Sequence, residues 1–336
     1  MATAETPLLQ TVRTDLLSRR ERLESVIERN DSEQLTDLLA QVDQALHRID
    51  NGTLGICEVC HDSIEEDRIL RDPLTSICLG CLTPNQQRAL EYDLELAGRI
   101  QNGLLPAPDI SIPGWEIAYH YRPAGVVGGD YCDVIPDERG GLYFMIADVA
   151  GKGVAAAMLT ANLRAVMRAL IPMNLPLEKT LAQANRLFCE SKLPMQYATL
   201  VVGHSSAKGE LELVNAGHLP ALILRGSQVE CFDSNDLPLG LFCDQQFTAV
   251  RTHFRAQDTL VIFTDGVSEA ENPAGEEYGT SALRSLLEQN GLCCPETLVK
   301  TCREHLERFR SGTTRNDDET LLAIQYAGAG ASAAIV

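Results

Sequence analysis

Aromatic side chains are scarce in this chain of 336 residues, where they make up 5% of the total and include one tryptophan. Basic residues are also few: 28 lysines and arginines stand against 47 aspartates and glutamates, which gives a net charge of -19. A charge of this sign repels phosphate backbones and anionic lipids, so it argues against a general nucleic-acid or membrane-surface binder. We therefore expect no direct nucleic-acid partner and no membrane partner.

Long apolar runs are missing as well. The most apolar stretch, residues 154–171, is interrupted by Arg164 and Arg168, whereas a membrane-spanning helix needs about 18 or more apolar residues in succession. The N-terminus does not follow the order of a secretory signal, because charged residues such as Glu5 and Arg13 interrupt it. The sequence therefore predicts a cytoplasmic protein. Hydrophobic residues still reach 45%, enough for a sizeable core, and the length predicts two domains at about 150 residues each.

Several well-known catalytic motifs are absent too. The sequence has no His-Glu-x-x-His metal motif and no Gly-x-Ser-x-Gly nucleophile motif. Gly151-Lys152-Gly153 contains a lysine but lacks the Ser or Thr and the earlier glycine of a phosphate-binding loop. The sequence therefore gives no support to zinc-protease, serine-hydrolase or P-loop chemistry.

Four of the eleven cysteines form two Cys-x-x-Cys pairs with 17 residues between them, Cys57 with Cys60 and Cys78 with Cys81. In a reducing compartment this spacing points to zinc rather than to disulfides. Four thiolates leave no open coordination position for water, so the sequence predicts one structural Zn²⁺. The ion would stabilise a segment that is too short and polar to build a core of its own.

The other seven cysteines lie mostly beside apolar residues, which predicts buried or inert thiols. They are Cys132, Cys189, Cys231, Cys243, Cys293, Cys294 and Cys302. The odd total of eleven argues further against a disulfide framework.

Apolar residues at spacings of three and four predict two helices within residues 1–50. The positions are Leu9, Val12, Leu16, Leu23 and Val26 in the first helix, and Leu35, Leu38, Val42, Leu46 and Ile49 in the second. The polar stretch between them contains Asp31 and Ser32, either of which could cap the second helix. The pattern predicts an antiparallel helical hairpin, which could be a simple spacer or a dimerisation arm. We expect a homodimer.

A third helical stretch begins at Thr83-Pro84, and residues 84–108 form the expected linker helix. From Trp115 onward, strands alternate with helices. Expected strands are 116–121, 142–147, 197–203, 210–215, 221–224, 246–252, 259–264 and 320–326, and expected helices are 154–171, 177–190, 281–288 and 295–309. Hairpin-like runs of strands with paired helices predict an α+β fold of sheet and helix layers rather than a doubly wound parallel sheet.

Aspartates follow buried strands or glycines at four places in this second domain. Asp148 and Asp265 each end an apolar run, Asp130 follows two glycines, and Asp317 precedes the last expected strand. Each could be a simple turn or capping residue. Four such carboxylates without a His or Cys nevertheless favour hard ions such as Mg²⁺ or Mn²⁺. Two such ions can together clamp a phosphoryl group.

Five motifs occur in a characteristic order along this domain. They are Gly128-Gly129-Asp130-Tyr131, Asp148-Val149-Ala150-Gly151-Lys152-Gly153, Asn215-Ala216-Gly217-His218-Leu219-Pro220, Phe263-Thr264-Asp265-Gly266-Val267-Ser268-Glu269-Ala270 and Asp317-Asp318-Glu319-Thr320. With them, residues 88–326 resemble the SpoIIE/RsbU-type branch of the PP2C (PPM) metal-dependent serine/threonine phosphatases. The resemblance implies a PP2C-like β-sandwich flanked by helix pairs, a centre of two Mn²⁺ or Mg²⁺ ions, and phosphoprotein substrates.

The same resemblance assigns residues to the metal centre. Asp130 and Asp148 would touch both ions, and the carbonyl of Val149 would supply a backbone ligand. Asp265 and Asp317 would complete the shell of the second ion. The implied reaction is attack of a hydroxide bound by the two metals on phosphoserine or phosphothreonine. The implied substrate is a phosphorylated regulatory protein of the anti-sigma-factor antagonist type.

The cysteine unit carries a resemblance of its own. Through the stretch Ile49–Cys60, Ile64 and Arg68, residues 6–82 resemble the DksA/TraR family of zinc-finger proteins. This resemblance implies a module that can bind RNA polymerase through an acidic hairpin tip. The tip here reads Asp-Ser-Glu-Gln at residues 31–34 instead of the Asp-x-x-Asp-x-Ala of the long family members. A scaffold reused for sensing or dimerisation is therefore the alternative.

Two functional hypotheses follow. The first is a cytoplasmic regulatory phosphatase, and the alternative is an RNA-polymerase-binding, DksA/TraR-like transcription regulator with a catalytically weak phosphatase domain. The expected domains are a helical hairpin at 1–50, a zinc finger at 51–83, a linker (switch) helix at 84–108, a phosphatase domain at 109–327 and a disordered tail at 328–336.

Overall fold

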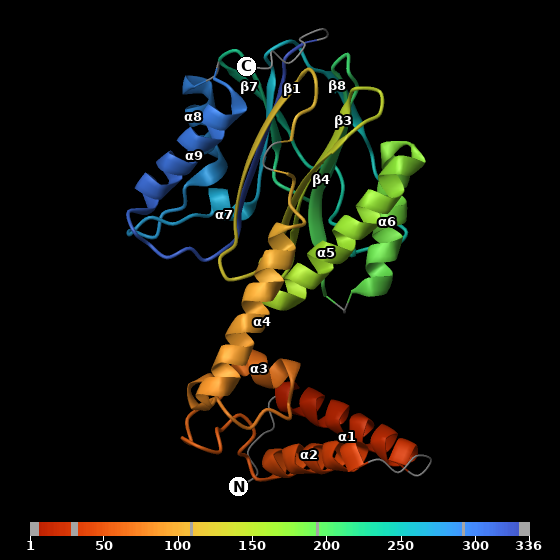
Figure 1. Cartoon of the computed structure of the whole chain (residues 1–336), viewed down its shortest axis with the longest axis vertical. Coiled ribbons are helices and arrows are strands. Elements are labelled where there is room, and N and C mark those ends of the chain that lie inside the picture. Colours follow the sequence, from red (N-terminus) through yellow and green to blue (C-terminus); the bar gives the residue numbers. More distant parts are fainter. Residues whose placement is uncertain (1–6, 28–32, 108–109, 193–194, 291–292, 329–336) are drawn as a thin grey trace. The chain divides into compact units, whose positions relative to one another are not determined.

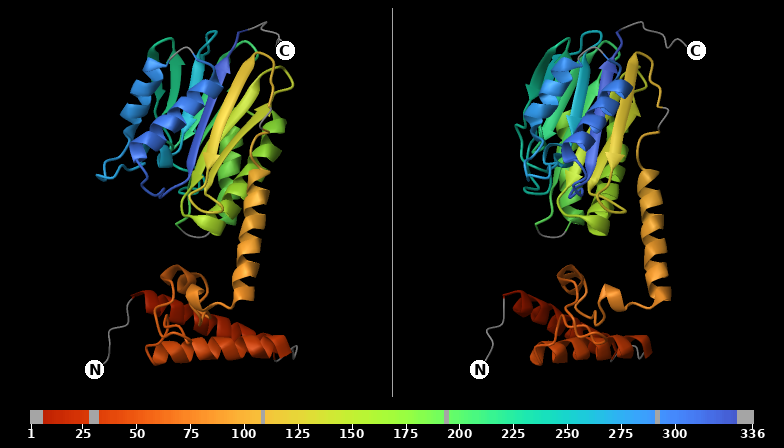
Figure 2. Two further views of the ribbon diagram at one scale, coloured as in Figure 1. Left: turned by 60° about the vertical axis from the view of Figure 1, so that its left-hand side comes forward. Right: turned by 90° about the vertical axis from the view of Figure 1, so that its left-hand side faces the viewer.

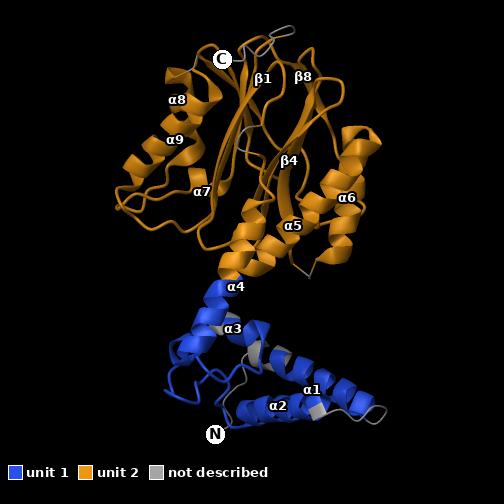
Figure 3. Cartoon of the chain, in the orientation of Figure 1, with its two compact units in different colours: residues 1–93 blue, residues 94–336 orange. Residues whose placement is uncertain are grey.

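A computed structural model describes residues 7–27, 33–107, 110–192, 195–290 and 293–328. The chain divides into two compact units, residues 1–93 and 94–336 (Figure 3). The division falls inside one helix, α4 (Pro84–Asn102), within the segment expected to be a linker. The expected tail lies outside the described residues from position 329 onward.

Unit 1 begins with two helices, α1 (Pro7–Ile27) and α2 (Glu33–Asp50). Ion pairs join Arg13 to Asp50 at 2.8 Å and Arg20 to Asp43 at 2.9 Å, and this order of partners makes the two helices antiparallel. Val12, Leu16, Val42, Ala45 and Ile49 form the small core between them. The predicted hairpin is therefore present, whereas its tip, with the proposed caps Asp31 and Ser32, lies outside the described residues.

The cysteine unit packs against α2 through one buried arginine. Arg48 is 7% exposed and donates to the carbonyls of Thr75 at 3.0 Å and Leu74 at 3.1 Å. The unit itself contains only a short helix, α3 (Glu66–Arg71), and a 3-10 turn, η1 (Leu79–Cys81). Because so little regular structure is present, backbone groups here are paired across loops, as between the Cys57 N–H and the carbonyl of Asp62 at 2.8 Å and between the Ile64 N–H and the carbonyl of Gly55 at 2.7 Å.

The helix α4 starts where the sequence predicted. The backbone N–H of Gln86 donates to Thr83 Oγ1 at 3.3 Å, and the Thr83 N–H donates to Gln86 Oε1 at 3.0 Å. This reciprocal pair satisfies two of the N–H groups that a helix start leaves free.

Unit 2 contains two five-stranded sheets in which every neighbouring pair is antiparallel. The first sheet has the order β1 (Trp115–Arg122), β10 (Glu319–Tyr326), β9 (Thr259–Phe263), β6 (Ala221–Arg225), β7 (Gln228–Phe232). The second has the order β2 (Asp130–Pro136), β3 (Leu142–Val149), β4 (Ala198–Ser205), β5 (Glu210–Ala216), β8 (Val250–His253). Sequence analysis missed β2 and β7, and it started β8 four residues too early.

Helices cover the outer face of each sheet (Figures 1 and 2). The pair α5 (Gly153–Leu170) and α6 (Leu177–Ser191) packs on the second sheet, and η2 (Ile171–Met173) links the two. The pair α8 (Gly279–Gln289) and α9 (Pro295–Arg310) packs on the first sheet, next to the one-turn helix α7 (Asp265–Ser268).

Alternation along the central strands explains this four-layer arrangement. In β3, Phe144 and Ile146 face the other sheet, whereas Met145 and Ala147 face the helices, and all four are 0% exposed. A strand that is apolar on both sides needs cover on both sides. The predicted α+β sandwich flanked by helix pairs is confirmed.

One stretch, Gly153–Met173, is long and apolar enough to cross a membrane by length and composition alone. In the structure, its side chains Leu159, Leu163 and Met167 are buried between α5, α6 and the second sheet. This part of its apolar surface is accounted for by packing, whereas Met158 is exposed.

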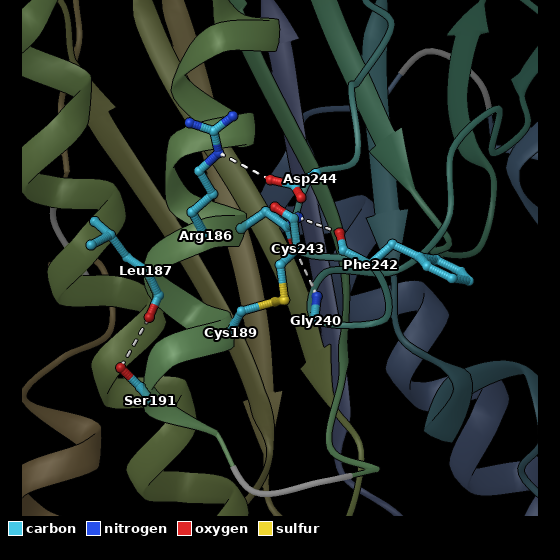
Figure 4. Close-up of a disulfide and its surroundings, with 9 residues drawn as sticks. Arg186, Leu187, Cys189, Ser191, Gly240, Phe242, Cys243 and Asp244 are labelled. Carbon is cyan, nitrogen blue, oxygen red and sulfur yellow. Dashed lines mark hydrogen bonds and ion pairs between the residues drawn. A yellow bond between two sulfur atoms is a disulfide. The ribbon is translucent and has the colours of Figure 1, made fainter.

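The prediction of inert thiols was wrong for two cysteines. Cys189 in α6 and Cys243 in the β7–β8 connection form a disulfide with a Cα–Cα distance of 5.9 Å (Figure 4). Cys231 and Cys294 are free and exposed, so for them only the inert half of the prediction is left, whereas Cys132 is buried as expected. Spacing could not reveal the pair, since the two partners are separated by 54 positions.

Candidate active site and metal centres

The first two candidate aspartates lie opposite each other on adjacent strands of the second sheet. Asp130 opens β2, Asp148 lies one residue before the end of β3, and the two are register partners. Their carboxylates therefore emerge at the same end of the sheet.

Asp130 is the most enclosed of the candidates, with 2% of its surface exposed. Its Oδ2 accepts hydrogen bonds from Thr264 Oγ1 at 2.7 Å and from Thr320 Oγ1 at 2.5 Å, and both donors belong to the first sheet. Burial, followed by the charge of Asp148, raises the pKa of Asp130 well above its usual value. The two hydroxyls only partly compensate this buried charge.

The two glycines before Asp130 are required by close approach. A Cβ on Gly128 would lie 2.3 Å from Asp318 Oδ2, and one on Gly129 would lie 2.7 Å from the carbonyl oxygen of Val149. No side chain fits at either distance without displacing a backbone or a carboxylate.

Asp318, which sequence analysis did not select, holds this glycine loop in place. It is 6% exposed, and its carboxylate accepts from the N–H groups of Ala124 at 2.7 Å and Gly129 at 2.6 Å. The carboxylate thereby fixes the backbone that leads into Asp130. The neighbouring Asp317 was predicted to be a metal ligand. Nothing in the sequence distinguishes the loop-holding role of Asp318 from the ligand role expected for Asp317.

Asp265 and Asp317 come from the first sheet. Asp265 begins α7 immediately after β9, and Asp317 precedes β10, which pairs with β9 at Phe263 and Leu321. Asp317 Oδ2 forms an ion pair with Lys152 Nζ at 2.8 Å, and Lys152 also donates to the carbonyl of Asn316 at 2.5 Å. Lys152, expected to be a solvated loop residue, is 63% exposed but has a carboxylate partner.

Burial and, after it, mutual repulsion raise the pKa values of the carboxylates in this cluster. Burial, with the charges of Asp265 and Asp317, raises the pKa of Asp148 to about 7. Burial and Asp317 also raise the pKa of Asp265. An arrangement that disfavours its own negative charge gains stability from a cation, and carboxylate oxygens suit Mg²⁺ or Mn²⁺.

The four aspartates do not converge on one point. Among the residues that the structure describes, only the cysteine cluster brings three or more ligand atoms within 4.8 Å of one another. The four aspartates offer only carboxylate oxygens, the donors that hard ions such as Mg²⁺ or Mn²⁺ prefer.

A buried ion pair supports the second half of the cluster. Arg310 of α9 and Glu319 of β10, which are 4% and 1% exposed, form an ion pair. Arg310 Nη2 also donates to the carbonyl of Gly266 at 3.3 Å, directly after Asp265. This arginine therefore ties the Asp265 turn to the strand that follows Asp317.

His218 stabilises a turn rather than acting as an acid or base. It is 6% exposed, its Nε2 donates to the carbonyl of Phe263 at 3.0 Å, and its Nδ1 accepts from Thr199 Oγ1 at 2.7 Å. Burial lowers its pKa to about 4, so the ring is neutral near pH 7. Its ring links the β5–β6 turn to the end of β9, just before Asp265.

Two small cavities flank the Asp265 turn. One, of 210 Å³, is lined by Asp148, Thr199, Gly217, His218, Leu219, Asp265 and Glu269. The other, of 220 Å³, is lined in part by Lys152, Gly266, Glu269, Arg310 and Asp317. Glu269 borders both, and its N–H donates to the carbonyl of Asp265 at 2.6 Å, in keeping with the supporting role expected for it.

The cysteine cluster of unit 1 is a separate metal centre. The sulfurs of Cys57, Cys60, Cys78 and Cys81 lie within 4.8 Å of one another, and those of Cys60 and Cys78 are 3.6 Å apart. Tetrahedral zinc with Zn–S bonds of about 2.3 Å separates its sulfurs by about 3.8 Å, so the set fits zinc. Backbone N–H groups of Cys60 and Cys78 lower the pKa of Cys57 to about 6, which favours the thiolate.

The raised pKa of Asp148 predicts how the stability of the metal-free protein depends on pH. The folded protein keeps this proton up to about pH 7, whereas an unfolded aspartate loses it near about pH 4. The folded state therefore binds more protons in this window, and its stability should fall as the pH rises from about 4 to 7. Thermal unfolding of metal-free protein across this range should show a declining Tm.

The matched variants are Asp148→Asn and Glu138→Gln, since Glu138 is an exposed carboxylate on the β2–β3 turn. We expect the first to flatten the decline and the second to leave it unchanged. Parallel Tm curves for wild type and Asp148→Asn would contradict the assignment of this proton.

Comparison with known proteins gives two family matches. Residues 138–327 match the family described as Stage II sporulation protein E (SpoIIE), and residues 52–87 match the prokaryotic dksA/traR C4-type zinc finger. Protein IcfG of Synechocystis sp. is 26% identical over 261 residues, which cover 69% of this chain and 41% of IcfG. Phosphoserine phosphatase RsbU of Bacillus subtilis is 24% identical over 242 residues, which cover 71% of each chain.

Among solved structures, the SiaA-PP2C domain of Pseudomonas aeruginosa superposes with a TM-score of 0.64 at 19% identity. The match covers 71% of this chain and 97% of that domain, so the sandwich of unit 2 has the PP2C fold. The SpoIIE match spans more than half of the 336 residues and includes three of the four candidate aspartates. The chain therefore belongs to the Stage II sporulation protein E (SpoIIE) family.

Proposed function

We propose that this protein is a Mn²⁺- or Mg²⁺-dependent protein phosphatase that hydrolyses phosphoserine or phosphothreonine on a regulatory protein. The observation that supports this most directly is the meeting of Asp130 and Asp148 from one sheet with Asp265 and Asp317 from the other. Two sheets of a PP2C fold thus bring four carboxylates to one end, where their mutual repulsion calls for cations.

The ligand assignment is part of the proposal. Asp130, Asp148, Asp265 and Asp317 would hold the two ions, and the carbonyl of Val149 would add a backbone ligand. The close approach of Gly129 to that carbonyl supports the last role, because any side chain at position 129 would crowd the oxygen. When bound, the ions supply a nucleophilic water and offset charge on the phosphoryl group.

The chain's own residues orient the proposed metal ligands and offset charge on the substrate. Thr264 and Thr320 hold the Asp130 carboxylate, and Asp318 holds the loop in front of it. Lys152 is exposed beside Asp317, where its ammonium can turn toward a substrate phosphate. Ala150, in the loop after Asp148, carries no titratable group, so water or another group must supply the proton for the leaving alkoxide.

The proposed substrate is a phosphorylated protein of the anti-sigma-factor antagonist type. Support comes from the likeness to RsbU, a phosphoserine phosphatase. We also propose that the protein acts in the cytoplasm and forms a homodimer.

A second candidate partner is RNA polymerase, favoured by the zinc-finger match at residues 52–87. In that case unit 1 would dock on polymerase and unit 2 would be a weak enzyme. The two functions separate experimentally, because a docking protein needs neither Asp148 nor Asp265 for polymerase binding.

Substitution of the ligands tests the phosphatase function. With Mn²⁺, the protein should hydrolyse p-nitrophenyl phosphate and a phosphoserine protein, and Asp148→Asn or Asp265→Asn should lower kcat by about 100-fold or more. Each change removes a charge at nearly constant volume, so folding should survive. Glu138→Gln is the matched control and should retain activity. Full activity in EDTA, or in both aspartate variants, would refute the two-ion site.

Glycine substitution tests the backbone ligand. Gly129→Ala should push the Val149 carbonyl aside and raise the Mn²⁺ concentration for half-maximal activity by about tenfold or more. Gly125→Ala, where a Cβ meets nothing closer than 3.7 Å, is the control and should behave as wild type. An unchanged Mn²⁺ requirement in Gly129→Ala would remove Val149 from the ligand set.

Metal analysis tests the zinc centre. Purified protein should hold about one zinc ion per chain, because four thiolates bind this ion in closed structural sites. Cys78→Ser should lose the zinc and keep Mn²⁺-dependent stabilisation of unit 2, whereas Cys294→Ser, which alters an exposed thiol, should keep both. Unchanged zinc content in Cys78→Ser would place the ligands elsewhere.

A further inference from the structure

The disulfide between Cys189 and Cys243 lies where small redox molecules can reach it. Cys243 is exposed and Cys189 is partly exposed at the end of α6 (Figure 4). A disulfide with this accessibility is open to thiol–disulfide exchange, unlike one that is sealed in a core. In a reducing compartment such bonds are transient and serve as sensors more often than as permanent crosslinks.

The residues between Asp233 and Cys243, here called the 233–243 segment, border the candidate active site at one end. Ser234 Oγ accepts from the Gly217 N–H at 2.7 Å, and a Cβ on Gly217 would lie 2.3 Å from Pro238 Cγ. Gly217 and its neighbour His218 line the 210 Å³ cavity together with Asp148 and Asp265. The segment therefore forms the outer support of one wall of that cavity.

A second contact links the segment to the metal loop. Leu239 is fully buried and exchanges two backbone hydrogen bonds with Ala198, at 2.8 and 3.0 Å. Ala198 is in turn the register partner of Val149. These contacts hold the middle of the segment on the sheet and do not involve either cysteine.

The far end of the segment is hydrogen-bonded to α6 through the side chain of Asn185. This residue is fully buried, accepts from the Gly240 N–H at 2.8 Å and donates to the carbonyls of Phe242 at 2.8 Å and Cys243 at 3.2 Å. The side chains of Leu237, Leu241 and Phe242 nevertheless expose 51%, 44% and 62% of their surface. Exposed apolar side chains are weakly ordered unless the backbone that carries them is held.

We infer that Cys189 and Cys243 are a redox-modification site, whose oxidation by peroxide orders the 233–243 segment and tightens binding of the protein substrate. This inference rests on the proposed phosphatase function. The Cα–Cα distance of 5.9 Å lies within the usual range for bonded cysteines, so the reduced pair needs little backbone movement to close.

The chemistry balances with hydrogen peroxide as the oxidant. Peroxide converts the exposed Cys243 thiol to a sulfenic acid and releases one water; the Cys189 thiol then attacks that sulfur, forms the S–S bond and releases a second water. Two thiols and one peroxide thus give one disulfide and two waters. A dithiol reductant reverses the reaction through a mixed disulfide, and the reductant itself becomes the disulfide.

We expect the redox state of the two cysteines to change the KM for the protein substrate and not the rate of the phosphate hydrolysis step. Reduction should raise KM for a phosphoserine protein about three- to tenfold, because loose side chains must then be ordered on binding. Hydrolysis of p-nitrophenyl phosphate, which is too small to reach the segment, should stay unchanged. Asp130, Asp148 and Val149 lie on β2 and β3, whose pairing does not involve the disulfide.

The experiment compares full-length protein treated with peroxide and with a phosphine reductant. Cys243→Ser should behave as reduced protein under both treatments, and Cys294→Ser, an exposed cysteine without a disulfide partner, should respond as wild type. Cys243→Ser keeps all four zinc ligands. If the KM of this variant still differed between the two treatments, the effect would come from another thiol and the inference would be overturned. An equal KM in both redox states of wild type would also overturn it.

A readout that does not involve activity separates this inference from the proposed function. Mass spectrometry after alkylation should show Cys189 and Cys243 protected only in oxidised protein, and chymotrypsin should cut at Leu241 or Phe242 faster in reduced protein. Alkylation of both cysteines after oxidation, or equal cleavage rates, would refute the site. A protein that passes both tests but hydrolyses no phosphoester would instead refute the phosphatase function.

Discussion

The carboxylate of Asp130, buried where the two sheets meet, is the constraint on which this end of unit 2 depends. Removing such a charge from water costs several kcal/mol. In the protein, two hydroxyls donate to it, those of Thr320 in β10 of the opposite sheet and of Thr264, which directly follows β9 of that sheet. The sandwich must therefore close here in one register, because a shift of β10 by one residue would turn Thr320 away. The register that packs the core therefore also places Asp130 in the site.

The double aspartate before β10 shows how two neighbouring carboxylates can take different tasks. Asp318 turns inward and receives backbone N–H groups from the glycine loop, whereas Asp317 remains half-exposed and meets Lys152. The inward residue gives the loop its shape, and the outward one is free to bind a cation. Gly128 belongs to the same arrangement, because a side chain there would collide with the Asp318 carboxylate.

Sequence patterns predicted the strands that end on aspartates, since an apolar run followed by Asp and Gly is a local signal. They missed β2 because Asp133 interrupts its apolar run. In the structure that charge is fully buried and held by Arg168, whose Nη2 and Nε lie 2.6 and 2.7 Å from it, and by the Tyr131 hydroxyl. The arginine is 35 positions away on α5, so no local pattern could supply it. The Cys189–Cys243 disulfide was missed for the same reason, because its two cysteines are 54 positions apart.

The contacts of Val149 suggest why catalysis and control can coexist in this fold. Metal ligands must be held to within about 0.5 Å, and the Val149 carbonyl is confined by Gly129 on one side while its strand pairs with Ala198 on the other. Ala198 also pairs with Leu239 of the 233–243 segment. The segment is thus fixed to the sheet at Leu239, while its exposed apolar side chains face solvent. A change at its solvent end can alter what the site captures without moving the atoms that would carry out the reaction.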